Sequence, residues 1–410
     1  MIKKIIFLLL ITPFCGYSQY SGTGSVSQGL ATTTQTNLYS CQGGRTTNVG
    51  VIVATNGSSW TVPASTNFTN TAFPFSSNLY NSCDGNMYAN AAAAIAALNG
   101  SDIVTVDADG EVITAYIFAD NYFEMYINGV EVGKDKVPYT QFNSSIVRFK
   151  VKRPFTIAMH LVDWEENLGL GSELNGGSAY HCGDGGMVAL FKDASNNIIA
   201  KTDNSWKAQT FYTSPIADLT CPTENGTLRL SSNCSTADVS NGSNFYALHW
   251  EKPANCFDYN FDDSSWPNAS VYTNATVGVN NKPAYTNFTD IFDNVTNDAD
   301  FIWSTNLILD NEVVVRYTVP STTGMIQDGY SHDLFSIFPN PTSDEIHLSL
   351  NLQFEKNNFK EVIIVNMLGE KVLECKNDFD KISLLNFDKG VYMVKVKYDN
   401  KFYSQKLIVK

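Results

Sequence analysis

The chain is long and acidic. It has 410 residues, more than one compact core usually contains, so we expect two or three domains. Hydrophobic residues make up 43% and charged residues 17%, a composition that excludes a wholly disordered chain. With 27 basic against 41 acidic residues the formal net charge is −14, so the basic surface that nucleic-acid binding needs is missing.

The first 19 residues have the pattern of a signal peptide. Lys3 and Lys4 precede an apolar run over 5–11, and Gly16-x-Ser18 supplies a small-x-small cleavage site. The apolar run is too short to cross a bilayer, and no other stretch is long and apolar enough. We therefore predict a signal peptide over 1–19, passage through the periplasm, and no transmembrane segment in the mature protein.

Cysteine usage agrees with export. Six cysteines lie in the middle of the chain, namely Cys41, Cys83, Cys182, Cys221, Cys234 and Cys256. An even number in an exported region indicates up to three disulfides, whose pairing the sequence leaves open. Cys41 and Cys83 are suited to join residues 20–100 to the rest of the chain. The alternative, a zinc site, lacks the CxxC or HxxxH spacing that such sites use.

Residues 20–100 and 101–319 differ in pattern. The first range is rich in Thr, Asn, Ser and Gly, and we expect an N-terminal extension with one short helix over Met87–Leu98. In the second range apolar and polar residues alternate with a period near two, which predicts a sandwich or jelly roll. Its expected strands are Ile103–Val106, Val112–Phe118, Tyr122–Ile127, Val130–Val132, Ile146–Val151, Phe155–Val162, Met187–Phe191, Ile198–Lys201 and Val313–Val319. Asn128-Gly129 predicts a tight hairpin.

Four motifs within 101–319 resemble a galactose-binding-like jelly roll. In chain order they are FADNYFEMYINGVEVGKD, KTDNSWKAQ, FDDSSWPNA and FIWSTNLILDNEVVVRYTV. The resemblance implies a fold that hosts both sugar binders and purely structural domains. The catalytic barrel that normally accompanies such modules is missing. Trp206 and Trp266, within these motifs, are expected in the core.

The C-terminal part follows a linker over 320–333 that is rich in Pro, Gly, Ser and Thr. Residues 334–410 carry closely spaced short strands, which indicates a small β-sandwich. The expected strands are Ile346–Leu350, Val362–Val365, Lys371–Leu373, Val391–Tyr398 and Phe402–Ile408.

This C-terminal part resembles the type A sorting domain of the type IX secretion system of Bacteroidetes. The resemblance rests on FPNPT, VIIVNMLGEKVL and KGVYMVKVKYDNKFYSQKLIVK, whose motif residues are Pro339, Asn340, Pro341, Gly369, Gly390 and Tyr392. It implies an Ig-like sandwich that the outer-membrane export machinery recognises. It also implies a protein that is secreted or held at the outer-membrane cell surface.

The segment over 163–184 is the best candidate for a ligand site. It is a long stretch rich in glycine and carboxylates between two predicted strands, and such loops are often functional. Its candidate ligand-binding residues are Asp163, Trp164, Glu165, Glu166, Glu173, Tyr180 and Asp184. Of these, Asp163, Glu165, Glu173 and Asp184 have the oxygen chemistry that Ca²⁺ binds. The alternative is a rim loop with Trp164 packed over the core and solvated acids.

Catalysis has weaker support, and no catalytic residue is assigned. Glu165 and Glu166 are neighbours, so in an extended chain they point to opposite sides, and each would need a partner such as Asp120, Glu124 or Asp184. There is no G-x-S-x-G, and His160 is expected to be a structural histidine. The sequence thus predicts an all-β exported protein with a glycan- or surface-binding body and no catalysis. The alternatives are a carbohydrate-active hydrolase using carboxylates of 163–184 and a structural surface or matrix protein.

Overall fold

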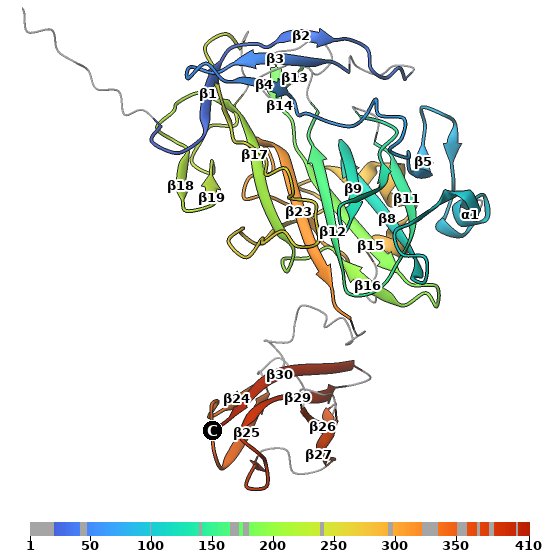
Figure 1. Cartoon of the computed structure of the whole chain (residues 1–410), viewed down its shortest axis with the longest axis vertical. Helices are drawn as coiled ribbons and strands as arrows, with labels where there is room; N and C mark the ends of the chain where they lie inside the picture. Colours follow the sequence, from blue (N-terminus) through green and yellow to red (C-terminus); the bar gives the residue numbers. More distant parts are fainter. Residues whose placement is uncertain are drawn as a thin grey trace, which may run out of the picture. The chain divides into compact units, whose positions relative to one another are not determined.

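The computed structural model of the chain consists of two compact units, Met1–Ser321 and Thr322–Lys410 (Figure 1). The structure describes residues 20–41, 47–98, 100–138, 142–164, 172–174, 180–237, 242–293, 298–321, 335–350, 359–366, 370–376, 381–398 and 401–410. The predicted signal peptide, most of the predicted linker, Glu165, Glu166 and Gly369 lie outside these ranges. In the described part, no helix is long and apolar enough to cross a membrane.

The first unit, here called the body, contains a seven-stranded antiparallel sheet. Its strand order is β1 (Ser25–Gln28), β20 (Tyr246–His249), β17 (Lys207–Ile216), β23 (Asp310–Val319), β12 (Phe155–Val162), β9 (Tyr122–Ile127) and β10 (Val130–Lys134). The predicted hairpin is confirmed between β9 and β10, where Asn128 and Gly129 both have positive φ, 52° and 83°. Strand β12 begins and ends where the sequence predicted.

A second sheet of nine strands faces the first. Its path is β21 (Ser270–Tyr272), β22 (Phe301–Trp303), β15 (Gly186–Lys192), β8 (Glu111–Asp120), β11 (Ser144–Val151), β5 (Ser77–Asn81) and β6 (Asn86–Met87). Off this path, β16 (Ile198–Lys201) pairs with β15, and β7 (Ile103–Thr105) pairs with β11. The all-β class that the sequence predicted is confirmed, whereas the jelly-roll topology stays a prediction.

The two sheets share the main hydrophobic core. Alternation places Ile157, Met159 and Leu161 of β12 in that core, packed with residues of β8, β11 and β15. Trp206 lies there too, and Trp266 is buried in a smaller cluster, so both packing predictions are confirmed.

The opposite face of the seven-stranded sheet, here called its outer face, is also covered. All eight residues of β12 are buried, which a sheet open to water on one side would not allow. Residues 49–75 and 250–266 supply the cover, in four smaller apolar clusters. Polar side chains on this face are therefore enclosed by protein.

Residues 20–100 take part in both large sheets of the body. They contribute β1, β5 and β6 to the two large sheets, and they form a small sheet of β2 (Thr32–Gln35), β3 (Val49–Val53) and β4 (Ser59–Val62). The predicted helix is shorter than expected, α1 (Ala91–Ala96). It begins later because Asn86 and Met87 are in β6, and because the Asn90 side chain caps it by accepting from the amide of Ala93 at 3.0 Å.

The remaining elements of the body are short. They are the hairpins β13 (Ser172–Leu174) with β14 (Tyr180–Cys182) and β18 (Thr223–Asn225) with β19 (Leu228–Leu230), the helices α2 (Pro283–Thr286) and α3 (Thr289–Phe292), and two 3₁₀ turns, Gly100–Asp102 and Val279–Asn281.

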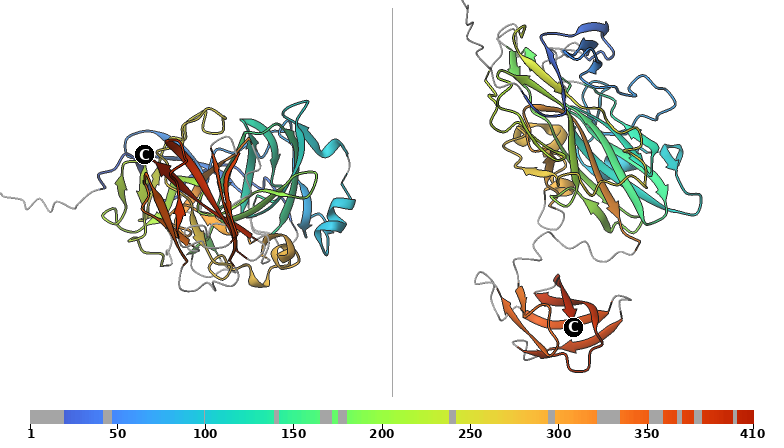
Figure 2. Two further views of the ribbon diagram at one scale, coloured as in Figure 1. Left: turned by 90° about the horizontal axis from the view of Figure 1, so that it is seen from below. Right: turned by 60° about the vertical axis from the view of Figure 1, so that its left-hand side comes forward.

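The second unit is a small sandwich of two antiparallel sheets (Figure 2). One sheet orders β24 (Phe335–Phe338), β25 (Glu345–Leu350) and β28 (Ile382–Ser383), and the other β27 (Lys371–Cys375), β26 (Phe359–Asn366), β29 (Gly390–Tyr398) and β30 (Lys401–Val409). A core of its own fills the space between them. All five strands predicted here are present.

Candidate functional site

The structure describes only part of the predicted 163–184 site. Glu165 and Glu166 lie outside the described residues. Hairpin β13–β14 sets the backbone of Glu173 opposite His181, and that of Tyr180 opposite Leu174. Which of these side chains meet a ligand therefore stays a prediction.

Trp164 has a packing role. It is fully buried, and its indole N–H donates to the carbonyl of Asn48 at 2.9 Å. Its ring makes edge contacts with Tyr122 and Phe68. Because no face of the ring reaches solvent, this residue matches the packing alternative rather than a platform for a sugar.

Asp163 and Asp184 share an acidic environment with Asp120, at the end of β8. Burial raises the pKa of Asp120 well above its usual value, and the charges of Asp184 and Asp163 raise it further. Burial also raises the pKa of Asp184 to about 6, against the opposing effect of Lys282. Within the described ranges, no three His, Cys, Asp or Glu side chains are arranged to hold a metal ion, so the Ca²⁺ site stays a prediction.

A buried polar cluster crosses the outer face of the seven-stranded sheet. His160 of β12 lies between Glu124 of β9 and Glu312 of β23, with Nδ1–Oε2 and Nε2–Oε1 distances of 3.4 and 2.8 Å. Lys252 Nζ lies 2.7 Å from the same Glu312 oxygen. The sequence indicated a structural role for His160 but gave no sign that these four residues meet.

Both carboxylates of this cluster are held in the ionised form. Burial alone would raise the pKa of Glu124, but His160 and other donors outweigh it and lower the pKa to about 2. Lys252 and His160 do the same for Glu312, whose pKa is also about 2. A general acid for glycoside cleavage needs a raised pKa, so the low pKa values of this cluster fit a structural role better than proton donation.

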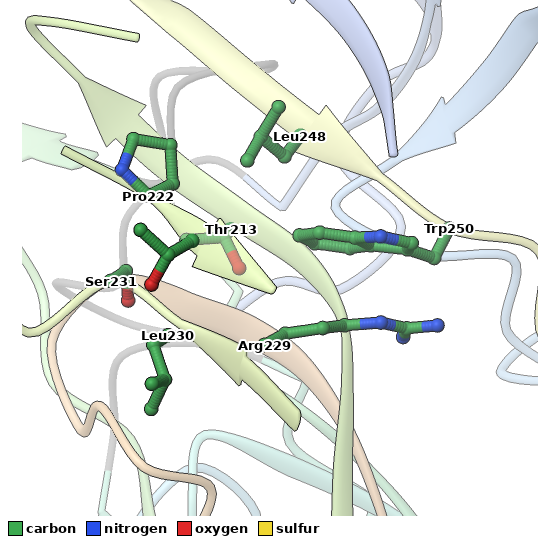
Figure 3. Close-up of a pocket in the computed structure, with 8 residues that line it drawn as sticks. Thr213, Pro222, Arg229, Leu230, Ser231, Leu248 and Trp250 are labelled. Carbon is green, nitrogen blue, oxygen red and sulfur yellow. The ribbon is translucent and has the colours of Figure 1, made fainter. Parts of the chain in front are cut away.

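A small cleft opens beside β18 and β19 (Figure 3). Its free space is about 10 Å³, room for about one water molecule, and its walls are Thr213, Pro222, Thr223, Arg229, Leu230, Ser231, Leu248 and Trp250. The Arg229 guanidinium lies along the indole of Trp250, 4.5 Å from the ring centroid. Aromatic and aliphatic walls thus meet hydroxyl groups in one concave site. No sequence signal marks this cleft, because its residues come from three separate parts of the chain.

Hydrogen bonds to Glu224 connect residues 20–23, at the start of the described chain, to the cleft. Its carboxylate accepts hydrogen bonds from the Tyr20 hydroxyl, from the amide and hydroxyl of Thr23, and from the indole N–H of Trp250. Burial acts to raise the pKa of Glu224, but these donors outweigh it and the pKa is lowered.

Two of the expected disulfides are formed. Cys41 is bonded to Cys83, so this bridge lies within residues 20–100 and does not join them to the rest of the chain as expected, and Cys221 is bonded to Cys234 across the hairpin that carries one wall of the cleft. A third bridge between the two remaining candidates is not formed, since Cys256 is a buried thiol. Cys182 instead has its sulfur 3.9 Å from the carbonyl of Ala237.

The sorting-motif residues in the second unit hold its strands together. Asn340 donates to the carbonyl of Lys406 at 2.6 Å and accepts from the amide of Ile408 at 2.9 Å. The Tyr392 hydroxyl donates to the carbonyl of Asp388 at 2.8 Å. The FPNPT motif is thus fastened to β30.

Comparison with known proteins identifies the second unit. Residues 336–410 match the family model of a secretion system C-terminal sorting domain, which confirms the resemblance and marks the chain for export to the cell surface or beyond by the type IX system. No curated protein matches the chain. A solved structure described as "Biofilm associated protein - BSP domain" is 8% identical over 74% of this chain and 76% of that chain, with a TM-score of 0.17. A similarity this low carries no argument about fold or function.

Proposed function

We propose that the body is a non-catalytic glycan-binding module, delivered to the cell surface or the medium by its sorting domain. The cleft beside β18 and β19 is the observation that carries this proposal. It combines the exposed Thr223 and the half-buried Arg229 and Leu230 with buried wall residues that include the indole of Trp250. Apolar walls with a few placed polar groups are typical of small-molecule sites, and sugars present both apolar and hydroxyl surfaces.

The state of the buried carboxylates in the polar cluster supports binding over hydrolysis. Glu124 and Glu312 are both engaged with His160 and both have low pKa values. Neither is suited to donate a proton to a leaving group near neutral pH.

The test is retention of the purified full chain on a panel of insoluble polysaccharides, with reducing ends followed in the same tubes. Thr223→Trp should fill the cleft, because Thr223 is an exposed residue of its wall, and should lower retention at least about tenfold. Asn225→Trp is the matched control, because it adds the same ring to the same strand outside the cleft walls. Equal loss in both variants, or no retention of the unaltered chain, contradicts the proposal.

A second candidate function, hydrolysis, has one observation in its favour. The pKa of Asp184 is raised to about 6, and Asp120 and Asp163 are close enough to influence one another. An acid with a raised pKa beside a second carboxylate is the pairing that glycoside cleavage uses. New reducing ends that disappear in Asp184→Asn but persist in Asp218→Asn, a change at an exposed aspartate, would favour this function over binding alone.

A further inference from the structure

We propose that Asn225 and Gly226, at the tip of the β18–β19 hairpin, form a self-modification site. The side-chain amide of Asn225 is converted there to a carboxylate without the help of an enzyme. This inference goes beyond the proposed function and does not depend on glycan binding.

The chemistry needs water as its only co-reactant. The backbone nitrogen of Gly226 attacks Cγ of Asn225, the new C–N bond closes a succinimide ring, and the Cγ–Nδ2 bond breaks. Ammonia leaves with the proton of the attacking nitrogen. Water then opens the ring at either of its two carbonyl groups, which yields aspartate or isoaspartate. Glycine after the asparagine favours the attack, because it has no Cβ to obstruct it.

The Asn-Gly dipeptide occurs repeatedly in this chain, so the surrounding structure must decide which copy reacts. The sequence contains six such pairs. Three of them, which begin at Asn56, Asn128 and Asn225, have both residues within the described ranges. Because the reacting groups are the same in all three, only their surroundings can make their rates differ.

The pair at Asn56 is held by hydrogen bonds on both reacting groups. The Gly57 N–H donates to the carbonyl of Ala54 at 2.9 Å. The Asn56 side chain donates to the Ser25 hydroxyl at 2.9 Å and accepts from the amide of Ser58 at 3.0 Å. Both groups would have to leave these partners before the attack, so we expect this pair to react slowly.

The pair at Asn128 is both held and crowded. The side-chain oxygen of Asn128 accepts from the amide of Thr156 at 2.8 Å, and its N–H donates to the carbonyl of Thr156 at 3.0 Å. A Cβ at Gly129 would lie 2.5 Å from a carboxylate oxygen of Asp258, so little space is left beside this backbone. Ring closure here would have to displace neighbouring segments.

The pair at Asn225 has none of these restraints. Both of its residues are exposed. Asn225 pairs with Leu228, so Gly226 is the first residue of a two-residue turn. Among the described residues, none forms a hydrogen bond with the Asn225 side chain or with the Gly226 N–H. Apart from the adjoining residues, no atom lies within 4 Å of the position that a Gly226 Cβ would take, which leaves room for the ring.

The products change the hairpin in two ways. Both add a negative charge next to Glu224, the carboxylate that holds Thr23 and Trp250. Isoaspartate also lengthens the backbone by one methylene, just before a turn to which Gln209 donates at the carbonyl of Thr227, at 2.8 Å. Like charges repel and the strand is displaced, so the hydrogen bonds of Glu224 weaken. The modification therefore loosens the N-terminal segment as the protein ages.

The test incubates the folded full chain at mildly alkaline pH in water labelled with heavy oxygen, and follows the peptides by mass spectrometry. We expect labelled aspartate and isoaspartate to form at Asn225 at least about tenfold faster than at Asn56 or Asn128. The rate should rise with pH, because the attacking nitrogen must lose its proton. In concentrated urea with the disulfides reduced, the three rates should become similar, because all three pairs are then equally exposed.

Asn225→Gln tests the consequence for the N-terminal segment. Glutamine keeps the amide, but its longer side chain has to close a larger ring, which forms more slowly. After incubation we expect faster amide exchange in Ser25–Gln28 of the unaltered chain, and the exchange of fresh protein in Asn225→Gln. Asn260→Gln is the matched control, because Asn260 is exposed and is followed by phenylalanine instead of glycine, so this variant should loosen with age as the unaltered chain does.

Two results would overturn the modification site. One is an equal rate at the three pairs in the folded chain, and the other is a difference between them that persists unchanged in urea, since the fold would then not select the site. Unchanged exchange in Ser25–Gln28 of a chain fully modified at Asn225 would overturn the predicted loosening.

Discussion

Glu224→Gln should loosen the attachment of the N-terminal segment to the body. The carboxylate of Glu224 holds Thr23 through its amide at 3.0 Å and its hydroxyl at 2.9 Å, and it holds the Trp250 indole at 2.9 Å. The Tyr20 hydroxyl and the amide of Gly24, at 3.4 Å, also donate to it. Every partner is a donor, so the amide of glutamine can satisfy some of them through its one oxygen but presents its own N–H groups to the others.

The expected cost is about 2 kcal/mol. A hydrogen bond to a charged group contributes roughly 1.5–3 kcal/mol, and a neutral one about 1 kcal/mol. The loss of about one hydrogen bond to the charged carboxylate, with weakening of the others, gives this figure. It lies near the low end of the range for charged hydrogen bonds because Glu224 and Thr23 are partly exposed to water. Strand β1 follows directly after this segment and forms the edge of the seven-stranded sheet beside β20.

Urea unfolding of the full chain, followed by tryptophan fluorescence, measures the cost, and amide hydrogen exchange locates it. We expect a lower midpoint for the body transition and faster exchange in Ser25–Gln28. Glu251→Gln is the control, because Glu251 is exposed and lies next to Trp250 in the chain. A loss below about 0.5 kcal/mol with unchanged exchange in β1 would refute the reasoning, since the hydrogen bonds would then add no net stability.

Three further predictions concern pH, a buried arginine and the sorting domain. Thermal stability should peak near pH 4–5. Carboxyl groups with raised pKa values make the folded state bind more protons than the unfolded state between about pH 4 and 7, so stability falls as the pH rises through that range. Carboxyl groups with lowered pKa values make the folded state bind fewer protons between about pH 2 and 4.5, so stability rises with pH there. The pKa is raised for Asp135, Asp184 and Asp310, and it is lowered for Glu124 and Glu312. A melting temperature that rises steadily to pH 7 would contradict this. Arg316→Met should cost about 3–5 kcal/mol, because it leaves Asp263 and the Cys256 carbonyl without their buried cation. Lys152→Met, at an exposed ion pair, should cost much less, and similar urea midpoints for the two variants would show that burial does not matter here. Deleting residues 334–410 should leave the protein in the periplasm, as cell fractionation would show, and unchanged surface delivery would argue against the sorting role.

Much of the local structure could be predicted from the sequence. Strand β12 and the β9–β10 hairpin were predicted because a period of two and an Asn-Gly turn are local signals. The sorting domain was recognised because its motifs follow one another over a short range. The helix near Ala91–Ala96 was predicted too long, since alanine propensity does not include the pairing of β6.

The sites could not be predicted in the same way, because they depend on register. Glu124 and Glu312 lie 36 and 152 positions from His160, and only the order β9–β12–β23 brings them together. Trp164 was an ambiguous residue in the sequence, since the cover supplied by residues 49–75 determines whether its ring is exposed. The cleft likewise needs β17, the disulfide-linked hairpin and β20 to meet.

The sequence by itself determined the class, the export route and most strands, because composition, short motifs and alternation act over a few neighbouring residues. Tertiary structure alone decided which face of the seven-stranded sheet is enclosed, which cysteines pair, and where aromatic and hydroxyl groups form a cleft. Burial and hydrogen-bond direction are properties of neighbours in space, and for this chain those neighbours come from distant strands.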